Sequence, residues 1–186
     1  MDAFTLSTLS SLAGYLWVLF KTWILLFISP IYPKFEPDIL WIIIPVWLNF
    51  IITEIYQERQ GTNFGNAIQN GLVAAFVGLD WMRSMTRAIT AGTASSGAVL
   101  HIKFGLSFLV FAYGVFVVYS GIKGKRITTR IGRIRGVTYV LAVFTPAVYN
   151  LVSLSRDFFL AVLLFYPLFH LLVNILDRKF PTPTYL

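Results

Sequence analysis

The stretch that decides the fold reads FGLSFLVFAYGVFVVYSG over residues 104–121 and contains no charged residue. A helix needs roughly 20 such residues to cross the hydrocarbon layer of a bilayer. The stretch that follows, IKGKRITTRIGRIRG over residues 122–136, carries six basic residues and no acidic one. A long apolar run that ends at a basic loop is typical of a membrane-spanning helix and its cytoplasmic flank.

The composition of the whole chain agrees with this central part. Of its 186 residues, 57% are hydrophobic and only 12% are charged, whereas soluble domains contain about 25% charged residues. The composition therefore excludes an ordinary soluble globular domain. The chain has no cysteine, which excludes disulfides, thiol catalysis and cysteine-bound metal centres. The net charge of +7 lies mainly in loops, so it predicts contact with anionic lipid headgroups and argues against a nucleic-acid partner.

Apolar runs of near-spanning length fill most of the sequence. We place six of them, at residues 9–29, 39–56, 64–82, 99–121, 137–154 and 158–176. Because a bilayer cannot satisfy free backbone polar groups, continuous runs of this length must be helices. The sequence therefore predicts an all-α, polytopic integral membrane bundle of six transmembrane helices, with residues 1–186 as a single domain. If the third run, the least apolar of the six, re-enters instead of crossing, the bundle has five.

Basic residues give the expected orientation. With six spans, both termini and the loops after the second and fourth runs lie on one side of the membrane. That side carries more of the basic residues, and the positive-inside tendency predicts that both termini are cytoplasmic. The residues counted outside the basic loop are Arg59, Arg178 and Lys179 on this side, and Lys34, Arg83, Arg87, Lys103 and Arg156 on the other.

The basic cytoplasmic loop, residues 122–136, has a periodic pattern. Ile127, Ile131 and Ile134 recur at helical spacing, with arginines one position before each of them. This pattern is consistent with a short interfacial amphipathic helix that lies on the membrane surface. We expect the basic side chains of the loop to contact anionic lipid headgroups or a partner protein. They are Lys123, Lys125, Arg126, Arg130, Arg133 and Arg135.

Small residues in the third run predict close helix packing. Ala67, Gly71, Ala74 (or Ala75) and Gly78 fall on one helical face. In a membrane, small side chains at such spacing let two helix backbones approach closely. The third run is therefore expected to be the central helix of the bundle. The alternative is a helix that lines a pathway, with Asp80 near one mouth.

Polar and ionisable side chains within the apolar runs are the candidate functional residues, because each is costly in hydrocarbon. They predict a polar pathway or hydrogen bonds that hold the helices together. The candidates are Asn49, Glu54, Asn70, Asp80, Asn150 and His170. His170 is more typical of a structural hydrogen bond than of a ligand, and no ligand spacing indicates a metal. The sequence implies no particular cofactor.

Two runs share a proline motif. PVWLN at residues 45–49 resembles PAVYN at residues 146–150, and each proline frees a backbone carbonyl one turn earlier. With six spans, the second and fifth runs are equivalent members of two three-helix halves, which is the inverted repeat of many transporters. Pro167 weakens this interpretation, because Leu171 follows it where the motif has asparagine. Chance similarity is the alternative, and Pro45, Pro146 and Pro167 are all expected to kink their helices.

The sequence leaves three hypotheses for the function. The sequence contains no HExxH, GxSxG or phosphate-binding loop, so it identifies no catalytic residue and argues against an enzyme. We favour a small transporter or channel with a polar pathway between the second, third and fifth helices, and a pore would require a homo-oligomer. The alternative is a non-catalytic subunit of a larger membrane complex, assembled with other membrane subunits. A membrane enzyme that uses His170, Asp80 or Glu54 as acid–base groups is the third hypothesis.

Overall fold

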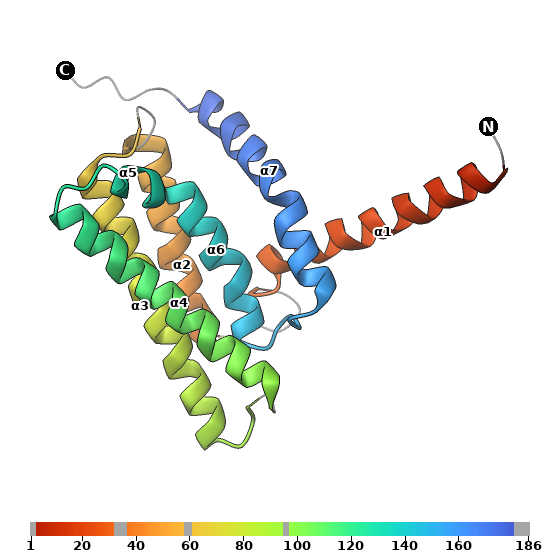
Figure 1. Cartoon of the computed structure of the whole chain (residues 1–186), viewed down its shortest axis with the longest axis horizontal. Coiled ribbons are helices and arrows are strands. Elements are labelled where there is room, and N and C mark those ends of the chain that lie inside the picture. Colours follow the sequence, from red (N-terminus) through yellow and green to blue (C-terminus); the bar gives the residue numbers. More distant parts are fainter. Residues whose placement is uncertain (1–2, 32–36, 58–60, 95–96, 181–186) are drawn as a thin grey trace.

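The computed structural model describes residues 3–31, 37–57, 61–94 and 97–180, and these residues form helices and turns without any strand. Lys34 and Arg59, which contribute to the expected orientation, lie outside the described residues. Figure 1 shows the arrangement of the helices. Their bounds are α1 Ala3–Ile28, α2 Pro37–Ile52, the π-helical turn η1 Thr53–Gln57, α3 Phe64–Thr90, α4 Ala98–Ile122, α5 Thr128–Ile131, α6 Ile134–Val148 and α7 Arg156–Lys179.

The helices have the length and composition of membrane spans. Four stretches are long and apolar enough to cross a bilayer: Thr8–Ile28, Pro37–Gln57, Ala98–Ile122 and Arg156–Lys179. Helix α6 is apolar but shorter. The chain is therefore an all-α membrane bundle, as predicted, and the count of six spans remains a prediction. Helix α3, which is 27 residues long, buries the polar side chains of Asn66, Asn70 and Asp80.

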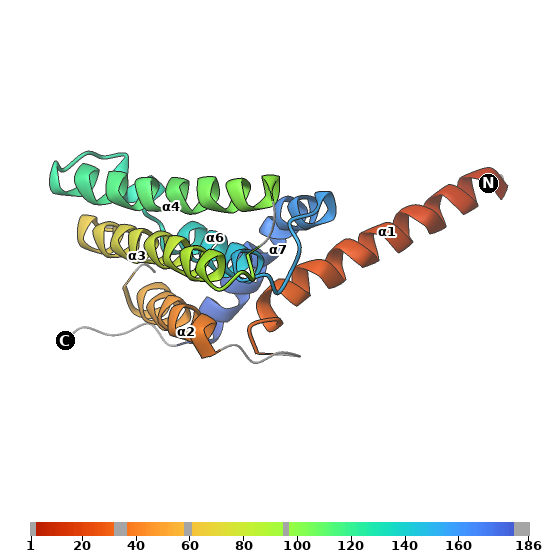
Figure 2. The ribbon, with the colours of Figure 1, turned by 90° about the horizontal axis from the view of Figure 1, so that it is seen from below.

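Helices α3 and α4 form the closest pair in the bundle and run side by side (Figure 2). A Cβ atom on Gly114 of α4 would lie 2.4 Å from the backbone nitrogen of Ala75. A Cβ atom on Gly78 of α3 would lie 2.6 Å from the backbone nitrogen of Phe111. Both positions accept only glycine. Any side chain would clash with backbone atoms of the facing helix, which cannot move aside as a flexible side chain can. The prediction that small residues of the third run allow close packing is confirmed, and α4 is the partner.

Two helices end elsewhere than predicted. Helix α3 continues to Thr90, well past the expected end at residue 82, and Arg87 in its last turn is favourable near a helix C-terminus. Helix α6 ends at Val148, before the expected end at residue 154. Its end coincides with Asn150, whose φ of 63° leaves the right-handed helical region.

The shared proline motif does not produce a shared structure. Helix α2 continues through Pro45 and Asn49 to Ile52, whereas α6 stops two residues before Asn150. Pro45 and Pro167 lie inside α2 and α7, while Pro146 lies in the last turn of α6. The second and fifth helices thus differ where the repeat would make them equivalent, and the structure gives the inverted repeat no support.

Two hydrophobic clusters hold the bundle together. The first joins α1, α6 and α7 through aromatic side chains, among them Trp23, Tyr139 and Phe169. The second joins α2, α3, α4 and α6 around Trp81 and Leu141. The N-terminal half of α1 projects away from the bundle (Figure 1), and the side chains of residues 8–18 are all exposed.

Candidate functional site

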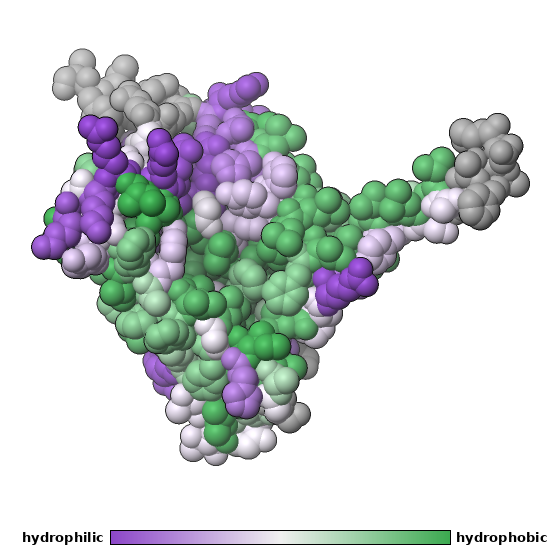
Figure 3. Space-filling model, viewed as in Figure 1, coloured by the Kyte–Doolittle hydropathy of each residue, from purple (hydrophilic) through white to green (hydrophobic). Residues whose placement is uncertain are grey.

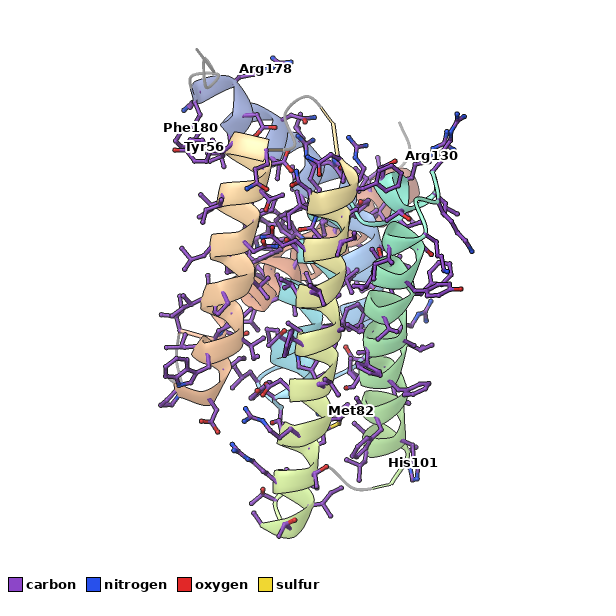
Figure 4. All side chains as sticks on the ribbon, turned by 90° about the vertical axis from the view of Figure 1, so that its left-hand side faces the viewer. Tyr56, Met82, His101, Arg130, Arg178 and Phe180 are labelled. Atoms are coloured by element: carbon purple, nitrogen blue, oxygen red, sulfur yellow. The ribbon has the colours of Figure 1, made fainter. Side chains whose placement is uncertain are left out.

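All the predicted polar residues except His170 lie at the two ends of the bundle. Figure 4 shows Tyr56, Arg130 and Arg178 at one end, which we call the basic end, and His101 at the other, which we call the distal end. Asp80 and Asn150 belong to the distal end. Asn49, Glu54 and Asn70 belong to the basic end. The second hydrophobic cluster, with Val46, Val77 and Leu141, fills the space between them.

A cavity of about 270 Å³ opens at the distal end, where α3, α4 and the end of α6 meet. Its charged lining residues are Asp38, Arg87 and Lys103, and Asp38 pairs with Arg87 at an N–O distance of 3.7 Å. Lys103 is only 3% exposed, and its Nζ donates a hydrogen bond to Oδ1 of Asn150. Two cations face one anion, so the charges lining the cavity sum to a positive value. Such a lining favours a small anionic solute.

Asp80 lies behind one wall of this cavity. Its carboxylate pairs with Arg83 and accepts a hydrogen bond of 2.5 Å from the hydroxyl of Tyr149, a lining residue. Next to Asp80, the indole nitrogen of Trp81 donates to Oγ1 of Thr145 at 3.2 Å and ties α3 to α6.

We predict that Asn150→Leu destabilises the protein by about 1–2 kcal/mol, because a leucine at positive φ is strained. Asn150→Gly removes the same amide but accepts the backbone conformation. Thermal unfolding in detergent should therefore rank wild type and Asn150→Gly above Asn150→Leu. If the two variants unfold at the same temperature, strain from the left-handed backbone at position 150 does not determine the stability of the variants.

A cluster of amides ties the helices together at the basic end. Nδ2 of Asn49 donates to Oδ1 of Asn70 at 3.2 Å, and Nδ2 of Asn70 donates to the carbonyl of Gly132 at 2.8 Å. The side chains of Gln69 and Thr53 both donate to Oδ1 of Asn49. The cluster joins α2, η1 and α3 to the basic loop. Here the predicted residues make the interhelical hydrogen bonds that polar groups in hydrocarbon require.

Arg135 is the centre of a second polar cluster at the same end. Its guanidinium donates to Glu54 Oε1 at 2.7 Å, to Asn174 Oδ1 at 2.5 Å and to Asp177 Oδ2 at 2.6 Å. Glu54 is 3% exposed and lies on η1, and π-helical turns are frequent at functional sites. Arg135, one of the basic residues expected to contact anionic lipid headgroups or a partner protein, lies in the first turn of α6 and makes these contacts within the chain. Asn174 and Asp177 follow His170 at helical spacing on α7, which is a polar stripe visible in the sequence, and both join this cluster.

We predict that Arg135→Met lowers the free energy of unfolding by about 3 kcal/mol, because it leaves two carboxylates without their cation. Arg133→Met, which removes an exposed arginine two residues away, is the matched control and should change stability little. Adding Glu54→Gln to Arg135→Met should recover part of the loss, since it removes one unpaired charge. Unfolding of Arg135→Met at the wild-type temperature would show that the cluster does not stabilise the bundle.

The remaining basic residues of the loop lie at the surface. Lys123, Lys125, Arg126, Arg130 and Arg133 are all exposed, and hydrophilic residues gather at this end of the molecule (Figure 3). The isoleucine spacing indicated a continuous interfacial helix, but residues 122–136, all of which the structure describes, do not form one. Only Thr128–Ile131 is helical, and Ile134 begins α6 and is fully buried.

His170 belongs to neither polar end. Its Nε2 lies 3.1 Å from the hydroxyl of Tyr166, one turn earlier on the same helix. Among the described residues, no group of three or more His, Cys, Asp or Glu side chains could hold a metal ion. The hydrogen bond of this imidazole is thus made within α7.

No family model matches this chain, and comparison with curated proteins and with solved structures found no similar chain. The fold and the polar sites define only the class of the protein. It is a polytopic α-helical membrane protein.

Proposed function

We propose that the protein is a transporter that takes a small anion into the cavity at the distal end. The observation that carries this proposal is the position of Lys103, a cation that is 3% exposed on a membrane-spanning helix and lines a cavity. An intramembrane cation is costly and indicates a functional site. The cavity has room for a small solute, not for a macromolecule.

The mechanism that fits is exposure of the cavity to one side of the membrane at a time. Below the cavity, apolar side chains including Val46, Val77 and Leu141 close the route towards the amide cluster of Asn49 and Asn70. A channel would need a continuous polar line through this layer, whereas a transporter needs the layer to open only after the solute binds. Pro45 lies beside Val46, where the loss of a backbone hydrogen bond makes bending of α2 easier.

Cysteine labelling tests the binding site directly, because the chain has no cysteine of its own. Ser84→Cys places a thiol in the cavity lining, and Thr86→Cys places one on the exposed face of the same helix. We expect acetate, lactate, succinate or phosphate to slow labelling of Ser84→Cys by a membrane-impermeant reagent. Labelling of Thr86→Cys should stay constant. If none of these anions protects Ser84→Cys, the cavity does not bind this class of solute.

A second candidate function is that of a subunit in a larger membrane complex. The observation in its favour is the N-terminal half of α1, which projects away from the bundle and exposes apolar side chains such as Leu9 and Leu12. A partner helix could cover this arm, and so could lipid. The mass of the particle extracted in mild detergent distinguishes the two functions: other subunits in the particle would favour the complex, and this chain alone would favour the transporter.

The exposed basic residues of the loop support a contact with anionic lipid. Each lysine or arginine near an anionic leaflet contributes roughly 1 kcal/mol to attraction. We predict that adding phosphatidylglycerol to neutral detergent micelles raises the unfolding temperature of the wild type. The gain should shrink when Lys123, Lys125 and Arg126 are replaced by glutamine. An equal gain in this variant would show that the lipid acts elsewhere.

A further inference from the structure

We propose that a groove between α1, α2 and α7 binds one chain of a phospholipid whose headgroup carries a primary amine. The groove encloses about 420 Å³ and is lined almost entirely by apolar side chains. Its walls include Trp23, Phe27, Trp47, Phe50, Phe169 and Leu172. This site is separate from the distal cavity and does not depend on the transport function.

The aromatic walls give the groove a defined shape. The rings of Phe27 and Phe169 stack with their centroids 6.3 Å apart, and Trp47 meets Phe50 edge to face at 5.7 Å. Such ring contacts restrain the side chains. Burial of a lipid chain here replaces contact with other lipid chains, which are equally apolar, so the groove alone gives little selectivity. Selectivity must come from the polar groups at its end.

Helical spacing leads the groove into the Arg135 cluster. On α7, Phe169, Val173 and Leu176 line the groove, and Asp177 is the next position on that face. Phe50 of α2 lines the groove, and Glu54 follows about one turn later on η1, which continues α2. Both helices therefore end the apolar groove at a carboxylate. An occupant that fits this arrangement has an apolar chain and a polar head.

The chemistry of the cluster selects the head. One guanidinium faces two carboxylates, and Oδ1 of Asp177 is buried without a hydrogen-bond partner. A buried acceptor without a donor is costly, and an ammonium N–H would supply the missing donor. Arg178 and Lys179 follow on the exposed last turn of α7, where a phosphate can meet them. Phosphatidylethanolamine offers both groups, whereas the quaternary nitrogen of phosphatidylcholine has no N–H to donate.

Native mass spectrometry tests the site with equimolar phosphatidylethanolamine and phosphatidylcholine of identical chains. A hydrogen bond to a charged group predicts that the wild type retains the ethanolamine lipid about tenfold more. Asp177→Asn should remove this preference. Asp157→Asn, the same substitution at the opposite end of α7, should keep it. Equal retention of the two lipids by the wild type would overturn the proposal.

A second pair of variants tests the groove without touching the charges. Leu172→Trp fills the groove, and Leu171→Trp places the same ring on a neighbouring exposed position outside its lining. Retention of phosphatidylethanolamine should fall for Leu172→Trp and persist for Leu171→Trp. Equal retention by both variants would place the lipid elsewhere. This pair remains decisive if Asp177→Asn does not fold.

Discussion

Replacing Gly114 by leucine is expected to prevent α3 and α4 from packing together. The added Cβ would lie 2.4 Å from the backbone nitrogen of Ala75 and 2.5 Å from the backbone carbonyl of Gly71. Overpacking against side chains costs about 1–3 kcal/mol. Here the opposing atoms are backbone, so the helices must separate and lose their closest contact. We expect the variant to yield no monodisperse particle in size-exclusion chromatography.

The control for this prediction lies on the same helix. A Cβ on Gly105 would meet nothing within 4 Å, so Gly105→Leu adds an equal side chain without a clash. It should elute and unfold like the wild type. If Gly114→Leu behaves like Gly105→Leu, the close approach of α3 and α4 is not required for the fold.

Lys103→Met is expected to weaken anion binding in the distal cavity by about tenfold or more, because a hydrogen bond to a charged group contributes roughly 1.5–3 kcal/mol. The substitution keeps the length of the side chain and removes its charge. The dissociation constant follows from protection of Ser84→Cys against labelling, measured with the anion that protects best. The effect should fall on binding and leave the particle intact.

Lys21→Met supplies the matched comparison, since Lys21 also lies on an apolar helix but is exposed and far from the lining of the cavity. It should bind the anion as the wild type does. Equal dissociation constants for the two variants would mean that Lys103 serves another purpose.

The sequence predicts the bundle well because its main signal is local. Apolar runs such as residues 104–121 need no partner to be recognised as helices, and the glycines of the third run mark a close packing face wherever the partner lies. Helix ends are harder to predict. The stop of α6 at Val148 depends on the left-handed conformation of Asn150, and this conformation leaves no mark in the hydrophobic pattern.

The polar sites depend on contacts between distant parts of the chain. Arg135 meets Glu54 across 81 residues, and a periodic pattern in the basic loop could only assign it to the loop surface. The distal cavity forms where the ends of several helices meet, so the position of Lys103 at the start of an apolar run does not indicate that it lines a cavity. Residues from a single helical face, such as Asn66 and Asn70 one turn apart on α3, are nearer to what sequence periodicity can reveal.

Uptake into proteoliposomes tests the central claim most directly. Purified wild-type protein would be reconstituted, and the initial uptake rates of acetate, lactate, succinate and phosphate would be compared with those of protein-free liposomes. The account predicts saturable uptake of at least one of these anions. If a folded, monodisperse protein moves none of them faster than protein-free liposomes do, the protein is not the anion transporter proposed above.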